Sequence, residues 1–269
     1  MKKLAIIFTF SLAAIVLQAQ TTINQVVTNS SGGTAGISGG GSISWSVGEP
    51  VIGTISTASN VSIAQGFLQT YTAVQALKNL TLTLYLEGLF NGTSMNKAKN
   101  AGGDQYPGLV ADQITVELHN AATPYALAAG FSDVNVNTDG SATVTGIAAT
   151  LNSNYYIVVK HRNSIETWNA SPLSFAGTSM AYNFSTDAIQ AFGSNMKLVA
   201  GKYVIFVGDV NIPQDGVIDS SDLTLVNNTA SVFSSGYIPT DVNGDGMVDA
   251  IDLVTTDNNA AKFVVVKKP

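Results

Sequence analysis

The chain has 269 residues, of which 45% are apolar and only 11% are charged, and its formal net charge is −6. The apolar share is enough for a buried core, and a sequence without cysteine excludes disulfide bridges, thiol chemistry and cysteine-bound zinc. An acidic chain is also a poor match for nucleic acid, whose phosphates select clustered Lys and Arg residues.

The N-terminal segment 1–20 has the pattern of a secretory signal peptide. Lys2 and Lys3 precede a run of fourteen mostly apolar residues, 4–17, and small and polar residues follow around Ala19. Fourteen residues are too few to span a bilayer core comfortably, since a spanning helix needs about 20. We expect cleavage beside Ala19 or Gln20 and a secreted or cell-surface protein with no later transmembrane segment; a retained anchor is the alternative.

Residues 21–75 are rich in Gly and Ser, and short apolar-alternating stretches lie between the glycines. These stretches predict strands joined by glycine turns, at 42–47, 51–55 and 61–67. We expect a short β segment here.

Residues 76–207 carry the clearest strand patterns. The stretch 80–87 alternates apolar with mostly polar residues, which buries one face of a strand, and Asp139-Gly140 is a hairpin signal. Strands at this spacing, with no long helical pattern between them, predict an antiparallel β-sandwich of Ig-like type. The other predicted strands are 114–119, 134–137, 142–144, 155–160 and 202–207.

Nine of the 18 acidic residues are aspartates between Asp209 and Asp257, and no Lys or Arg occurs from 203 to 261. A one-sided charge block is usually a solvated or disordered tail. Here the aspartates recur at fixed spacing, and the spacing occurs twice.

The stretch 241–252 places oxygen-bearing side chains at loop positions one, three, five, nine and twelve, with Gly246 at position six for a sharp turn. The backbone carbonyl of Met247 at position seven adds a further oxygen. Calcium takes six to eight oxygens, and four carboxylates this close repel one another without a cation. The predicted side-chain ligands are Asp241, Asn243, Asp245, Asp249 and Asp252.

The same pattern occurs 30 residues earlier, where 215–223 aligns with 245–253. A repeat that covers both the ligands and the following helix indicates a duplicated unit. The first loop has two extra residues, because 212–214 stand where the second loop has only Gly244. Either they bulge outward and the ligands still converge, or the site is weakened. We expect two calcium ions, the first held by Asp209, Asn211, Asp215, Asp219, Asp222 and the carbonyl of Val217.

Apolar residues at helical spacing follow each loop and predict two short helices. Packing of these helices on each other would pair the loops. The predicted packed faces carry Leu223, Val226, Ala230 and Phe233 in the first repeat, and Leu253, Ala260 and Phe263 in the second.

The repeat pair, 208–264, resembles a dockerin, the duplicated calcium-binding module that plugs into cohesin domains. The resemblance rests on Asp-x-Asn-x-Asp-Gly-x-Val-Asp-x-x-Asp at 241–252. It implies a cohesin-like partner or cell-surface assembly, chosen in part by loop positions ten and eleven, which are Ser220-Ser221 and Ala250-Ile251. It also implies an association with polysaccharide breakdown.

Two further features bear on this resemblance. The Lys-Arg pair typical of a dockerin helix is missing, and the equivalent region carries Asn227, Asn228, Asp257 and Asn258 instead. The segments 44–50 and 65–67 resemble motifs of secreted surface proteins of Bacteroidota.

The main hypothesis is a non-catalytic calcium-binding protein whose repeat pair docks to a protein partner or rigidifies the C-terminus. The alternatives are an accessory component of extracellular polysaccharide degradation with a glycan-binding sandwich, and a weak glycoside hydrolase. Trp168 either stacks on a sugar or fills a sandwich edge, while Glu87 and Glu117 are the carboxylates of a weak glycoside hydrolase if they face each other. His119 and His161 are too few for zinc, and we expect both at the surface or rim.

Overall fold

The computed structural model describes residues 31–37, 41–47, 54–56, 62–64 and 77–269. Contacts divide the chain into two compact units, Met1–Val74 and Gln75–Pro269. The predicted domain 76–207 and the predicted module 208–264 therefore lie within the same unit. The signal-peptide prediction for 1–20 lies outside the described residues.

The first unit contains two short hairpins among its described residues. The strands predicted at 42–47, 51–55 and 61–67 correspond to β2, β3 and β4, and the rest of the last two stretches lies outside the described ranges. The hairpins pair β1 (Ser31–Ile37) with β2 (Gly41–Val47), and β3 (Thr54–Ser56) with β4 (Ser62–Ala64).

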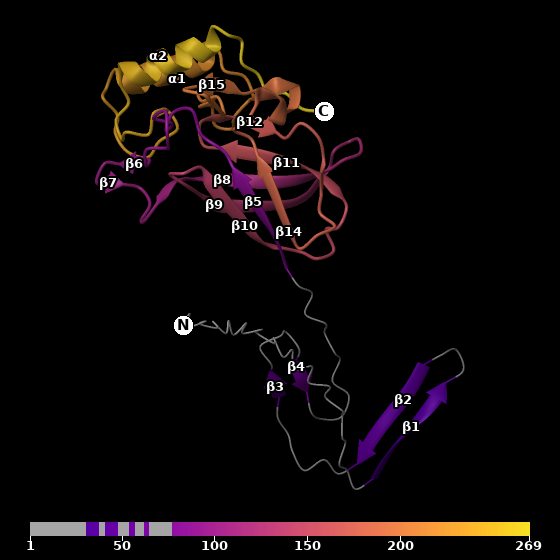
Figure 1. Cartoon of the computed structure of the whole chain (residues 1–269). Helices are drawn as coiled ribbons and strands as arrows, with labels where there is room; N and C mark the ends of the chain where they lie inside the picture. The colour runs from indigo at the N-terminus through magenta and orange to yellow at the C-terminus, as the bar shows by residue number, and fades with distance from the viewer. Residues whose placement is uncertain (1–30, 38–40, 48–53, 57–61, 65–76) are drawn as a thin grey trace, which may run out of the picture. The chain divides into compact units, whose positions relative to one another are not determined.

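The second unit is built on one eight-stranded sheet with the order β12-β11-β8-β9-β10-β5-β14, in which β13 pairs with β11. All neighbours are antiparallel except β14, which runs parallel to β5. Figure 1 shows the sheet curling on itself, with the helices at one end. The strands are β5 (Lys78–Thr83), β8 (Val110–Asn120), β9 (Leu127–Asn137), β10 (Ser141–Ile147), β11 (Asn154–His161), β12 (Ser164–Trp168), β13 (Leu173–Ser174) and β14 (Ser179–Asn183).

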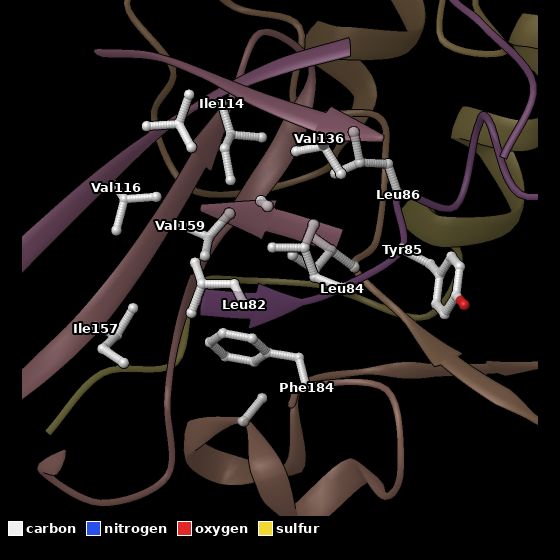
Figure 2. Close-up of a cluster of buried hydrophobic side chains, with 14 of the residues drawn as sticks. Leu82, Leu84, Tyr85, Leu86, Ile114, Val116, Val136, Ile157, Val159 and Phe184 are labelled. Carbon is white, nitrogen blue, oxygen red and sulfur yellow. The ribbon is translucent and has the colours of Figure 1, made fainter. Parts of the chain in front are cut away.

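The mainly β architecture predicted for this region is confirmed. Period-two alternation determines which side chains enter the core: in β5, the residues at 78, 80 and 82 are buried and those at 79 and 81 are exposed. Figure 2 shows Leu82, Ile114, Ile157 and Phe184 pointing toward one another inside the curl. Each of these side chains is at most 2% exposed.

Two predicted strands are shorter than expected, and their ends reach the helical region. The stretch 80–87 leaves the sheet after Thr83, because Leu84 and Glu87 bond to Gly140 and Ile205 instead of continuing the β5 ladder. The stretch 202–207 contributes only β16 to a hairpin. The remaining short strands are β6 (Lys99–Asn100), β7 (Gly103–Asp104), β15 (Lys197–Val199) and β16 (Lys202–Val204).

Two eleven-residue helices, α1 (Ser220–Ala230) and α2 (Ala250–Ala260), lie side by side at one end of the sheet (Figure 1). Asp219 and Asp249 cap their N-termini, and each forms a capping box with the aspartate three residues later. Within the described ranges, neither helix nor any other is long and apolar enough to cross a membrane.

The prediction that Phe233 and Phe263 lie on the packed helix faces is wrong. Each helix ends three residues earlier, and the chain then turns through a positive φ of 50° and 53° at the two phenylalanines. The turn directs both side chains outward, where they are 72% and 84% exposed.

We predict that Leu82→Ala lowers the free energy of unfolding by about 2–5 kcal/mol, because it opens a cavity at a fully buried position. Leu109→Ala makes the same chemical change at a side chain that is 73% exposed, and should cost less than about 0.5 kcal/mol. Urea denaturation of the two variants measures the difference. Equal losses would contradict the assigned core.

Candidate metal centre

The second loop folds its carboxylates inward around backbone N–H groups. Asp241 and Asp252 are both fully buried. Oδ2 of Asp241 accepts a hydrogen bond from the N–H of Gly246 at 3.0 Å, and the two oxygens of Asp252 accept bonds from Val242, Asn243 and Asp249 at 2.8–3.0 Å. Gly246 has φ +90°, which is the conformation that the position-six turn requires.

The first loop reproduces this arrangement. Oδ2 of Asp209 accepts from the N–H of Gly216 at 3.2 Å, and Asp222 accepts from Val210 at 2.8 Å and from Asp219 at 3.0 Å. Gly216 has φ +81°. The two loops therefore have the same internal hydrogen-bond pattern at positions one, six, nine and twelve.

The two extra residues of the first loop bulge outward. Ile212 is 83% exposed, while Gln214 turns back so that its Nε2 donates to the carbonyl oxygen of Asp209 at 2.7 Å. Asp215 still meets Asn211, whose Nδ2 donates to Oδ2 of Asp215 at 2.8 Å, as Asn243 does to Asp245 at 3.1 Å in the second loop. Of the two possibilities left open by the sequence, the structure has the outward bulge.

The position-seven residues pair each loop with the segment beyond the other helix. Val217 forms a bridge with Val265, and Met247 forms one with Ser235. The bridging bonds of the first loop use Gly216 and Ile218, so the peptide groups of Val217 itself face away from the partner segment. Its N–H donates to Asp215, as the N–H of Met247 does to Asp245.

The position-nine aspartates, Asp219 and Asp249, cap the helices as well as closing the loops. Each accepts a bond from the N–H two residues later at 2.7 Å. Among the residues that the structure describes, no three acidic or histidine side chains form a ready-made metal cluster. Backbone N–H groups hold the carboxylates near one another through hydrogen bonds. In each loop, the charges at positions five and twelve lie close enough to repel the charge at position one.

One carboxylate oxygen in each loop stands apart. Oδ1 of Asp209 and Oδ1 of Asp241 are buried and accept no hydrogen bond within the described part of the chain. The two side chains occupy position one of their loops and are 1% and 0% exposed. A buried oxygen without a donor is costly, and a bound water or a cation can relieve that cost.

Burial raises the pKa of Asp209 to about 7, and the charges of Asp222 and Asp215 add to the effect. Burial also raises the pKa of Asp241 to about 6, although the Arg162 guanidinium opposes the rise. The pKa values of Asp222 and Asp252 are raised, chiefly by burial. Both loops thus hold carboxylates that are short of positive charge.

The sheet contributes residues that the sequence analysis did not assign to the site. Arg162 and Asn163 form the turn between β11 and β12, and they donate to the carbonyl oxygen of Asp241 at 2.9 and 3.0 Å. They lie almost 80 residues before the loop, and no spacing pattern in the sequence connects the two. The prediction of a surface position for His161 is wrong, since it is buried and its Nε2 lies 3.0 Å from Asp112.

The residues considered for glycan chemistry are occupied by other contacts. Trp168 is 5% exposed, lies against His119 and Tyr156, and therefore fills the sheet edge. Glu87 and Glu117 belong to separate networks. Glu87 binds Lys197, Asn259 and the N–H of Val207, while Glu117 binds Lys160 and His119.

No protein-family model and no curated protein matches the chain. Among solved structures, it is similar to a type II cohesin–X-dockerin complex from Acetivibrio cellulolyticus, crystallised as a C-terminal and as an N-terminal interface mutant. Each alignment covers 69% of this chain and 99% of the matched chain at 12% identity, with TM-scores of 0.40 and 0.39. A likeness of this size assigns neither a fold nor a partner.

We predict that the metal-free chain loses stability as the pH rises from 5 to 7. The pKa values of Asp209 and Asp241 lie above the ordinary 3.8, so in this window the folded chain binds more protons than the unfolded chain. The melting temperature should fall by several degrees, and Asp209→Asn with Asp241→Asn should flatten the profile. A melting temperature that rises across this window in the metal-free wild type would contradict the assignment.

Proposed function

We propose that the chain is a secreted, non-catalytic calcium-binding protein whose repeat pair, 208–264, is a dockerin-like module holding two ions. The observation that carries this proposal is the pair of buried, unpartnered oxygens, Oδ1 of Asp209 and of Asp241. They stand at equivalent positions of a repeat, so one local accident does not account for both.

Calcium fits the donor set of each loop. The loops offer carboxylate, amide and peptide oxygens and no nitrogen or sulfur ligand, which is the chemistry that hard cations select. The ligands are those expected from the sequence, with position one as the buried anchor and positions three and five at the more open side. An ion would neutralise the mutual repulsion of positions one, five and twelve.

The module serves first to rigidify the C-terminal part of the chain. Nδ2 of Asn259 on α2 donates to Glu87 and to the carbonyl of Val207, both at 2.7 Å. A Cβ on Gly88 would lie only 1.7 Å from the carbonyl oxygen of Val242, so the backbone of the sheet unit packs directly on the second loop. Ion binding would therefore stabilise the sheet and the helices together.

We also infer that the curled sheet is an antiparallel sandwich of Ig-like type. The support is a core enclosed between β5, β8 and β11, whose other neighbours pair antiparallel; the parallel edge strand β14 is the exception. Such a fold presents loops at its two ends, and the repeat pair lies at one of these ends.

Calorimetric titration of the full, metal-free chain with calcium tests the proposal. We predict two bound ions, with dissociation constants in the broad range of about 10⁻⁶ to 10⁻³ M. Asp215→Ala and Asp245→Ala should each remove one ion, because each deletes the exposed position-five oxygen ligand of a single loop.

Asp257→Ala is the matched control, since it makes the same change at an exposed aspartate outside both loops. It should leave two ions bound. A titration without heat, or one in which all three variants behave alike, would refute the calcium assignment.

Docking to a protein partner is a second candidate function. The groove between α1 and α2, of about 500 Å³, is lined by Leu223, Leu253 and Val254 and bordered by Asp257. Val254 is 58% exposed and Ile251 is 59% exposed. The sequence has no Lys or Arg from 203 to 261, so the groove has acidic but no basic side chains at its border. Such a surface fits a cohesin-like domain that presents apolar side chains flanked by Lys or Arg.

We predict that Val254→Lys weakens binding to an immobilised cohesin panel at least about tenfold, because it places a charge in the groove. Val232→Lys makes the same change at a residue that is 71% exposed and does not line the groove, and should bind normally. Binding should also be lost in EGTA. Equal binding by the two variants, or no binding by any cohesin, would exclude this role.

A further inference from the structure

The two loops have the same internal hydrogen bonds, but different residues outside the ligand set hold each loop in place. In both, the carbonyl oxygen of the position-one aspartate is held by side-chain amide or guanidinium groups. For Asp209 the donor is Gln214, a residue of the same loop, at 2.7 Å. For Asp241 the donors are Arg162 and Asn163, which belong to the sheet.

The second loop is embedded in the sheet unit on several sides. The N–H of Lys99 donates to the carbonyl oxygen of Gly244 at 2.9 Å, and a Cβ on Gly244 would lie 2.3 Å from Leu89. Arg162 also donates to the carbonyl of Ile238, and Asn163 to that of Pro239 at 3.1 Å. The backbone before and within this loop is therefore held by residues that do not belong to the repeat.

The first loop has weaker external support. Its bulge is solvent-exposed at 212–215. Among the described residues, its hydrogen bonds to the sheet unit before the repeat are one from Gln214 to the carbonyl of Ser164 and one from Gly208 to Asn163, and its apolar contact is Ile218, which is buried in the core of the sheet unit. Its other backbone bonds join it to 264–266, at the end of the chain.

Arg162 is itself held in place, which allows it to position the loop. Its guanidinium lies 4.5 Å from the ring centroid of Tyr237, and its Nε lies 3.5 Å from Oδ2 of Asp112. Asp112 is fully buried and also binds His161 and the hydroxyl of Tyr237. The Nε of Arg162 makes no hydrogen bond within the described residues, so the stacking on Tyr237 and the charge of Asp112 orient the guanidinium, whose Nη1 donates to the backbone carbonyl of Asp241.

We propose that Arg162 and Asn163 are positioning residues for the second metal site: they hold the loop 241–252 in its binding shape before the ion arrives, while the loop 209–222 takes its shape only with the ion. This rests on the calcium function proposed above. The repeat would then contain one preformed site and one ion-dependent, switchable site. Calcium removal would loosen the first loop and α1 while α2 stays attached to the sheet.

Hydrogen exchange on the full chain tests the proposal, because equivalent amides report on each loop. The N–H groups of Gly216 and Gly246 both donate to the position-one carboxylate of their own loop. With calcium, both should be protected. In metal-free protein, exchange at Gly216 and Val217 should quicken at least about tenfold, and exchange at Gly246 and Met247 should change by less than about threefold.

Arg162→Gln should make the second loop behave like the first. In metal-free protein, exchange at Gly246 should rise about tenfold, and calcium should restore its protection. Arg162→Lys keeps a charged donor and should preserve most of the protection. Gln214→Ala is the matched change at the first loop and should leave Gly246 unaffected. Asn163→Ala provides a second test should Arg162→Gln fail to fold.

The outcomes separate this proposal from the calcium function. Equal exchange of the two loops in metal-free wild type would overturn the positioning role even if two ions bind. If Arg162→Gln raised exchange throughout β5 and β8, with and without calcium, Arg162 would be a general structural residue and the proposal would fail. If calorimetry showed no ion binding at all, the proposed function itself would fail.

Discussion

The repeat pair, 208–264, is built around two buried carboxylates, Asp209 and Asp241, each of which keeps one oxygen without a hydrogen-bond partner within the described residues. The other oxygen of each accepts a hydrogen bond from the N–H of the position-six glycine. The position-twelve aspartate accepts a hydrogen bond from the N–H of the residue after position one, and so holds the start of the loop. Folding alone therefore leaves one buried carboxylate oxygen in each loop without a partner, and a divalent ion can bind it. Every larger feature of the repeat pair follows from closing these loops, because each closed loop starts and caps a helix.

The sheet unit and the repeat pair are joined by polar contacts that each bury a side chain. Asn259 and Glu87 fasten α2 to the segment that follows β5, and the Arg162–Asn163 turn fastens the second loop to the end of β11. Buried polar groups of this kind are costly to break singly, so they favour one relative placement of sheet and helices. The two repeats are therefore not equivalent, because these polar contacts with the sheet unit are made mainly by the second repeat.

Local patterns in the sequence predicted the strands at 114–119 and 155–160, the hairpin at Asp139-Gly140 and the two helices, because periodicity and turn chemistry act over a few residues. They did not predict the end of 80–87 or the burial of His161, which depend on partners far along the chain. They also missed the turn at Phe233, which is held by local bonds to Ala230 and Thr229, because apolar spacing does not mark where a helix ends. The loop residues could be predicted as ligands because they share one short pattern. Arg162 and Asn163 were missed because only the fold brings them to Asp241.

A crystal structure of the full chain grown with calcium, with anomalous scattering used to locate the ions, is the most direct measurement. The account predicts two peaks, each about 2.3–2.6 Å from a position-one oxygen, Oδ1 of Asp209 or Oδ1 of Asp241. Loops without a peak, or with both of these oxygens bonded to protein donors instead, would contradict it.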